Sequence, residues 1–168
     1  MGYRSEVGAV VSVDTTGKKP ITLKMGDGSE RESYTFFHTD EDKAKFKEVV
    51  GKMKLIMGHW VYESFKEELG WYDCKIVLHC PHSKWYPDYE DVKAWNRFWN
   101  IAQDMEGVSG VFARAGEEDG DLEYEEFGES PDYESCHTIQ GVAFGYETNR
   151  RAVDDEEPQA QDAISPQS

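Results

Sequence analysis

The chain of 168 residues has 34 acidic and 18 basic side chains, a net charge of −16 and an isoelectric point near 4.6. This negative net charge argues against a protein that binds duplex DNA through a basic face. It also argues against attraction to anionic lipid surfaces. It favours a basic partner or bound cations, although an acidic surface that serves solubility alone is the competing explanation. The length is that of a single domain.

The acidity is concentrated in the last third of the chain. No Lys or Arg stands between Ala115 and Asn149, and the segment 117–134 packs ten carboxylates into eighteen residues. The first 113 residues are close to balanced. Four apolar or aromatic side chains interrupt the run, namely Leu122, Tyr124, Phe127 and Tyr133. Such residues can anchor an ordered acidic surface against a core, so the segment is expected to be a strand edge or an ordered loop.

The first part of the chain indicates a strand and a hairpin. Residues 6–13 are apolar and β-branched, which predicts a strand followed by a turn-rich stretch over 14–20. Two short strands over 21–25 and 34–38 flank the turn Gly26-Asp27-Gly28, which predicts a hairpin-like extension.

Two helices are expected from apolar residues at helical spacing. Thr39 followed by three acids is typical of a helix N-cap, and the pattern predicts a helix over 41–57. A shorter helix is expected over 60–69. An acidic turn over 88–91 precedes the second main helix, whose predicted buried stripe is Val92, Trp95, Trp99, Ala102 and Met105.

The remaining strands complete an α+β fold. Alternation predicts one strand over 71–80 that ends at Pro81, another over 108–115, and a last one over 135–147. Helices and strands in this order predict an antiparallel-rich sheet with two main helices on one face, a ferredoxin-like βαββαβ arrangement with additions. We expect one domain over 1–148 and a disordered acidic tail over 149–168.

The cysteine residues and the hydropathy of the chain indicate in which cellular compartment the protein is expected. Three cysteines form no disulfide framework, and Cys74 and Cys80, six residues apart on the same expected strand, are too far apart to bridge. We expect no signal peptide, because residues 1–6 are polar and no apolar h-region follows them. No stretch approaches the eighteen apolar residues of a membrane-spanning helix. These features predict reduced thiols, a cytoplasmic location and no membrane partner.

Three segments of the chain stand out as motifs, namely MGYRSEV at 1–7, KWYPDYEDV at 84–92 and GVFARAGEE at 110–118. Together they resemble a family of small acidic proteins found in tailed bacteriophages. The resemblance implies a phage-encoded accessory protein that acts in the bacterial host cytoplasm, and it carries over no catalytic residue. The chain departs from the family in its extension over 14–38 and in its long acidic tail.

The acidic segment is the preferred functional site. Carboxylates on an anchored surface can capture a basic surface of a host protein that handles nucleic acid, and can imitate nucleic acid in doing so. The predicted partner-binding residues are Glu117, Glu118, Asp119, Asp121, Glu123, Tyr124, Glu125, Glu126, Phe127 and Tyr133.

The alternative is a single-stranded nucleic-acid-binding protein that stacks bases on an aromatic platform and recruits partners with its acidic tail. The platform residues would be Lys84, Trp85, Tyr86, Tyr89 and Lys93. The competing explanation for these aromatic side chains is a hydrophobic staple at the start of the second main helix.

No pattern predicts catalysis, a metal or a cofactor. The Cys and His residues that could converge are His79, Cys80, His82, Cys136 and His137, but their spacing is not that of a zinc site. The acidic segment lacks the glycine of a calcium loop, since Tyr124 stands in its place. Phosphate-binding and nucleophile motifs are absent from the sequence. We therefore expect a non-enzymatic protein, and the sequence leaves its oligomeric state open.

Overall fold

Five strands form one antiparallel sheet in the computed structural model, which describes residues 4–65 and 68–136. Their order across the sheet is β4-β5-β1-β6-β7. The bounds are β1 Ser5–Val13, β4 Leu69–Tyr72, β5 Lys75–Ser83, β6 Val108–Gly116 and β7 Leu122–Phe127. All neighbouring strands run antiparallel, so the predicted antiparallel-rich α+β class is confirmed.

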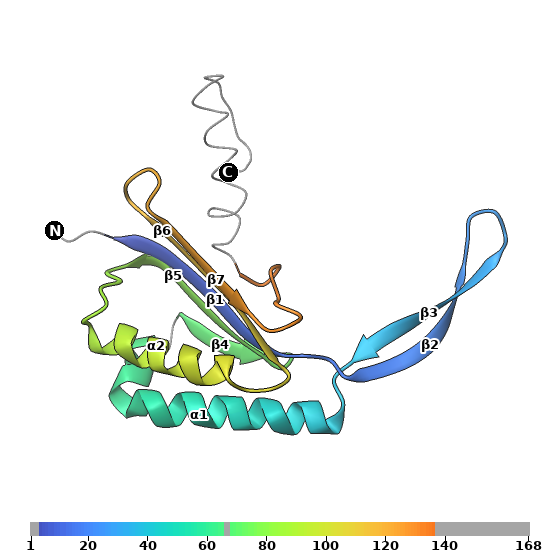
Figure 1. Cartoon of the computed structure of the whole chain (residues 1–168), viewed down its shortest axis with the longest axis horizontal. Helices are drawn as coiled ribbons and strands as arrows, with labels where there is room; N and C mark the ends of the chain where they lie inside the picture. The colour runs from blue at the N-terminus through green and yellow to red at the C-terminus, as the bar shows by residue number, and fades with distance from the viewer. Residues whose placement is uncertain (1–3, 66–67, 137–168) are drawn as a thin grey trace, which may run out of the picture.

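Two helices in the described part of the chain cover one face of this sheet (Figure 1). They are α1 Asp40–Phe65 and α2 Glu90–Gln103. α1 is kinked at Gly58, whose φ of 64° lies in the left-handed region that glycine adopts without steric cost. The kink separates the two helical segments predicted over 41–57 and 60–69. The second segment is shorter than predicted, because Leu69 already belongs to β4.

The strand order is that of a ferredoxin-like sheet with two additions. Along the chain, β1, α1, β4, β5, α2 and β6 follow the βαββαβ pattern, and across the sheet they lie in the order β6-β1-β5-β4. The first addition is a separate two-stranded hairpin, β2–β3, inserted between β1 and α1. The second is β7, which extends the sheet beyond β6 and carries part of the acidic segment.

The main core lies between the helices and the sheet. α2 buries four residues of the predicted stripe, Val92, Trp95, Trp99 and Ala102, together with Ala94 and Phe98. The fifth predicted residue, Met105, lies beyond the end of the helix and is only partly buried. Val7, Ala9 and Val11 of β1 face these side chains from the sheet. Burying one large apolar side chain contributes about 1.5–3 kcal/mol, so the aromatic residues compensate for the scarcity of Leu and Ile.

Residues 71–80 form a hairpin and not the single strand predicted for them. Tyr72 pairs with Lys75, and the turn between them consists of Asp73 and Cys74, with φ values of 50° and 59°. Two successive left-handed residues are typical of a type I′ turn, in which glycine usually takes the second position. Because a cysteine stands there, the sequence carries no turn signal at this point.

β5 also continues past Pro81, where the sequence analysis ended the strand. The register of β1 against β5 shifts between Ser5, which pairs with Ser83, and Val7, which pairs with Cys80. Such an irregularity is a β-bulge, and a proline is tolerated there because the hydrogen-bond ladder is already interrupted.

The inserted hairpin projects away from the sheet and helices as an arm (Figure 1). Its strands are β2 Gly17–Lys24 and β3 Glu30–Phe37. The predicted extension is confirmed, but β2 starts inside the stretch 14–20 that was expected to be a turn. Five large apolar side chains of the arm are exposed, namely Leu23, Met25, Tyr34, Phe36 and Phe37.

The base of the arm is tied to the start of α1 through a capping box. The Thr39 hydroxyl accepts a hydrogen bond from the Asp42 backbone N–H at 3.1 Å, and the Asp42 carboxylate accepts one from the Thr39 N–H at 2.9 Å. Thr16 donates to the same carboxylate through its backbone N–H at 2.9 Å. The predicted N-cap at Thr39 is thus confirmed.

Part of the predicted C-terminal structure lies outside the described residues. Of the strand expected over 135–147, Ser135 lies in a turn, and residues from 137 onward, including the expected tail over 149–168, are not described. Within the described chain, neither helix combines the length and the apolar content needed to cross a membrane.

Candidate partner-binding site

Residues 117–127 of the acidic segment form the turn and the outer strand of an ordered β-hairpin. Gly116 donates its N–H to the Asp121 carbonyl at 2.8 Å and thereby closes the turn between β6 and β7. Gly120 adopts a φ of 83° within this turn. β7 forms one edge of the sheet. Of the two sequence-based alternatives, a strand edge is the one found.

The side chains of β7 alternate between the two faces of the sheet. On the helix-covered face, the cross-strand pairs are Glu123 with Arg114, Glu125 with Phe112 and Phe127 with Gly110. On the opposite face, the pairs are Leu122 with Ala115, Tyr124 with Ala113 and Glu126 with Val111. The carboxylates of the strand are therefore divided between both faces.

Phe127 anchors the hairpin to the core. Its side chain is 8% exposed and packs edge-on against Trp99, with ring centroids 4.8 Å apart. The ring also covers Gly110, where a Cβ atom would clash with it. The apolar partner contact expected of Phe127 is therefore ruled out, because the ring is already buried within the protein.

The outer face of the hairpin presents two tyrosines around one carboxylate. Tyr124 and Tyr133 donate hydrogen bonds to the same oxygen of Glu126, at 2.6 and 2.5 Å. These bonds, first that of Tyr124 and then that of Tyr133, lower the pKa of Glu126. Both tyrosine side chains remain about two-fifths exposed, at 41% and 42%. The predicted residues Tyr124, Glu126 and Tyr133 thus form one exposed surface.

The turn of the hairpin places three further predicted carboxylates in solvent. Glu117, Glu118 and Asp119 are all exposed. Glu117 accepts a hydrogen bond from the backbone N–H of Arg4 at 2.9 Å, so it lies against the start of β1. These side chains extend the acidic surface beyond the end of β7.

Arg114 neutralises part of the charge on the inner face. Its guanidinium lies 2.7 Å from Asp121 and 3.2 Å from Glu123, and its side chain is 11% exposed. The hydrogen bond to Asp121 outweighs burial and raises the pKa of Arg114, with a further contribution from Glu123. Asp121 and Glu123 therefore hold the hairpin together as well as adding to its acidity.

A second ion pair fixes the segment that follows β7. Lys75 of β5 donates to Asp132 and to the Ser135 hydroxyl, both at 2.8 Å. Burial alone would lower the pKa of Lys75, but the hydrogen bond to Asp132 outweighs it and the pKa is raised. This contact holds the segment that contains Tyr133 against the sheet.

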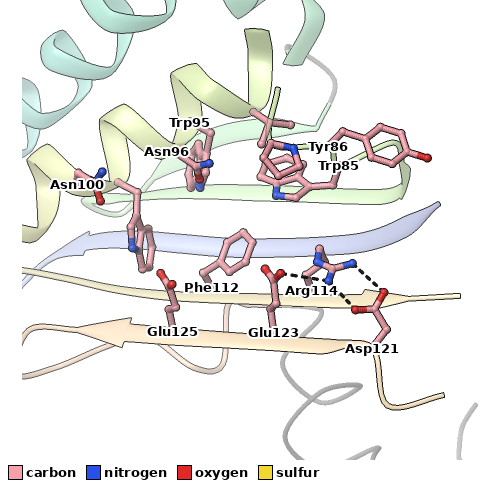
Figure 2. A pocket seen from close by; sticks show the side chains of 13 residues that line it. Trp85, Tyr86, Trp95, Asn96, Asn100, Phe112, Arg114, Asp121, Glu123 and Glu125 are labelled. Carbon is pink, nitrogen blue, oxygen red and sulfur yellow. Dashed lines mark hydrogen bonds and ion pairs between the residues drawn. The ribbon is translucent and has the colours of Figure 1, made fainter. Parts of the chain in front are cut away.

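A cavity of about 580 Å³ opens between α2 and the β6–β7 hairpin. Figure 2 shows Glu123 and Glu125 pointing from β7 toward α2, with Phe112 and Arg114 of β6 between them and the helix. The helix and the loop before it provide the other wall, made of Trp85, Tyr86, Pro87, Val92, Trp95, Asn96, Trp99 and Asn100. The acidic strand thus faces an aromatic wall.

The residues of the alternative nucleic-acid platform do not form an open stacking surface. Trp85 is partly buried between Phe65 and Phe112, with ring centroids 6.4 and 6.0 Å away. Tyr86 and Tyr89 pack edge to face on each other, at 5.2 Å. Of the cations, Lys84 is exposed and Lys93 lies 3.2 Å from Glu90. The adjoining cavity carries carboxylates, which disfavours a phosphate backbone.

The cysteine and histidine residues named in the sequence analysis are gathered into no metal-binding group in the part of the chain that the structure describes. Cys74, Cys80 and Cys136 are buried and form no disulfide. Burial raises the pKa of Cys80 to about 12, which disfavours the thiolate that a nucleophile requires. Among the described residues, no group of three or more His, Cys, Asp or Glu side chains could hold a metal ion. His137 lies outside that part of the chain.

Comparison with protein-family models, curated proteins and solved structures returned no match for this chain.

The sequence analysis named the acidic strand, and it named Trp85 and Tyr86 only as part of the alternative platform, so it missed the rest of the wall that the strand faces. Asn96, Asn100 and Arg114 line the cavity and were not among the predicted site residues. The available signal was the spacing of Asn96 and Asn100, four residues apart beside the buried stripe of α2. This spacing did not indicate a site, because the sequence does not show that β7 lies across from the side of α2 that carries the two asparagines.

Proposed function

We propose that this protein is a binding protein, of the phage accessory type that its family resemblance implies, which captures a basic host protein through the β6–β7 hairpin. The partner would be a protein that handles nucleic acid in the bacterial cytoplasm, since such proteins present clusters of Lys and Arg. The supporting observation is that the acidic segment is a fixed surface, held by Arg114, Phe127 and Lys75.

Order in the acidic segment matters because it reduces the entropy lost on binding. A disordered acidic tail must give up conformational freedom when it docks, whereas a preformed strand has already lost it. Among the described residues, the carboxylates of Asp119, Glu125 and Glu129 have no ion pair or hydrogen bond. Their charges are thus available to a partner.

The charge density of the strand favours docking on a basic surface over close imitation of duplex DNA. β7 has three carboxylates, Glu123, Glu125 and Glu126, in six residues. At about 3.4 Å per residue this is roughly one charge per 7 Å. Duplex DNA carries one negative charge per about 1.7 Å of its axis. The charge density of the strand is therefore well below that of duplex DNA.

The test is capture from a nuclease-treated bacterial lysate by the wild type and two charge-reversed variants. The first variant changes Glu118, Asp119 and Glu125 of the hairpin to Lys. The second, its control, makes the same change in net charge at the exposed residues Glu48, Asp104 and Glu106. We expect a basic protein to be captured by the wild type and the control but lost with the hairpin variant. Capture that survives the hairpin reversal, or that both variants abolish equally, contradicts the proposal.

A further inference from the structure

The cavity between α2 and the β6–β7 hairpin combines aromatic walls with an acidic rim. Trp85, Trp99 and Phe112 belong to the lining together with the carboxylates of β7. Figure 2 shows the ring of Phe112 beside Glu123 and Glu125. The cavity volume of about 580 Å³ is within the range of roughly 300–1,000 Å³ found for ligand sites. Aromatic faces and carboxylates both attract organic cations, the first through the ring quadrupole and the second through charge.

The charges around the cavity do not cancel. Among the described residues that line it, Arg114 is the one cation, against the three carboxylates of Asp121, Glu123 and Glu125. Arg114 is held by Asp121 and Glu123. The carboxylate of Glu125 has no hydrogen bond or ion pair among the described residues. The free charge of the rim is therefore negative and is located at Glu125.

One polar group beside the cavity has no partner in the described structure. Trp95 is fully buried and belongs to the lining, and its indole N–H has no hydrogen-bond acceptor among the described residues. Because this side chain has no exposed surface, a ligand in the cavity does not contact its N–H. The groups that attract a ligand are therefore the aromatic rings of the lining and the carboxylate of Glu125.

We infer that the cavity receives an arginine side chain of the captured partner, an inference that rests on the function proposed above. A guanidinium is planar, stacks on aromatic rings and binds a carboxylate through two parallel hydrogen bonds. Glu125 would accept those bonds, with the guanidinium beside Trp99 and Phe112. The peptide backbone around the arginine supplies carbonyl acceptors, which match the side-chain amides of Asn96 and Asn100.

Two short peptides test the inference without the partner. The probe is acetyl-Ala-Arg-Ala-amide, and its control is the same peptide with citrulline, which is nearly isosteric with arginine but uncharged. The indole N–H signals of the five tryptophans report on the cavity in a nuclear magnetic resonance titration of the full chain. We expect the signals of Trp85, Trp95 and Trp99 to shift with the arginine peptide, and its affinity to exceed that of the citrulline peptide by about fivefold or more.

Two single variants assign the effect to the cavity. Glu125→Gln removes the unpaired charge of the rim. We expect it to lower the affinity for the arginine peptide by about fivefold. Glu129→Gln removes an equal charge from an exposed residue outside the cavity and should change the affinity by less than about twofold. Equal binding of the two peptides, or equal effects of the two variants, would overturn the inference.

The two proposals fail in different ways. If the wild type captures a basic protein from lysate and the arginine peptide produces no shift, the cavity assignment is wrong and the acidic hairpin still stands as the binding surface. If the peptide binds as expected and hairpin reversal leaves lysate capture unchanged, the proposed function is wrong while the cavity remains a cation site.

Discussion

Arg114 and Asp121 form a two-point ion pair across the β6–β7 turn, with guanidinium–carboxylate distances of 2.7 and 3.2 Å. The same guanidinium reaches Glu123 of β7 at 3.2 Å. One largely buried cation thus offsets part of the repulsion within a strongly acidic hairpin. Arg114 and the buried ring of Phe127 together fix the strand that carries the proposed binding surface.

Replacing Arg114 with Met should therefore destabilise the protein. The side chain is 11% exposed, whereas Asp121 and Glu123 are 33% and 55% exposed, so solvent screens part of the interaction. We expect a loss of about 1–2 kcal/mol in the free energy of unfolding, measured by urea denaturation. Arg114→Lys keeps the charge but not the two-point geometry. Its free energy of unfolding should lie between those of the wild type and Arg114→Met. An unchanged midpoint for Arg114→Met would contradict this account of the hairpin.

The capping box of α1 predicts a pH-dependent contribution to stability. Burial alone would raise the pKa of Asp42, but the hydrogen bonds from Thr16 and Thr39 outweigh it and lower the pKa to about 2. A carboxyl whose pKa is lower in the folded state than the ordinary 3.8 stabilises the fold above that value, and the contribution is lost as the pH falls toward 2.

Asp42→Asn should consequently be less stable than wild type by about 1 kcal/mol at pH 6, and the difference should shrink between pH 4 and pH 2. Thermal unfolding followed by circular dichroism across this range measures it. Asp40→Asn is the control, because Asp40 is exposed in the same helical turn. A difference between wild type and Asp42→Asn that stays constant down to pH 2 would show that the ionised carboxylate is not what caps the helix.

The fold and the candidate site differ in how much the sequence reveals. The stripe of α2 and the N-cap at Thr39 were predictable because they depend on local spacing and chemistry. The turn at Asp73 and Cys74 was not, since left-handed backbone at a cysteine leaves no sequence signal. The cavity was also beyond prediction, because it depends on which side of α2 lies across from β7, a relationship between segments far apart in the chain.

The β2–β3 arm should be removable without loss of the body of the fold. Its strands pair with each other, and its apolar side chains are largely exposed. Replacing residues 19–35 with Asn-Gly keeps Thr16, Gly17 and Phe37 at the base and supplies a two-residue hairpin turn. We expect the free energy of unfolding to change by less than about 0.5 kcal/mol. A loss of 2 kcal/mol or more in urea denaturation would mean that the arm supports the sheet or the helices.

The buried thiols should be unreactive in the folded protein. Burial raises the pKa of Cys80 to about 12 and also raises that of Cys74. At pH 8 the thiolate fraction of Cys80 is then roughly a thousandfold below that of an exposed cysteine. Iodoacetamide labelling followed by peptide mass spectrometry should modify neither residue in native buffer and both in urea. Rapid native labelling of Cys80 would contradict its burial against the helices.

The most direct test of the central claim is the affinity of the captured host protein for the purified variants, measured by calorimetry at low and moderate salt. We predict that binding by the wild type weakens as salt rises, because exposed charges are screened over about 10 Å at 0.1 M ionic strength. The variant in which Glu118, Asp119 and Glu125 are changed to Lys should lose most of that affinity at low salt. The control variant, with the same change at Glu48, Asp104 and Glu106, should keep it. Equal affinities for the two variants would show that net charge, and not the β6–β7 hairpin, governs capture.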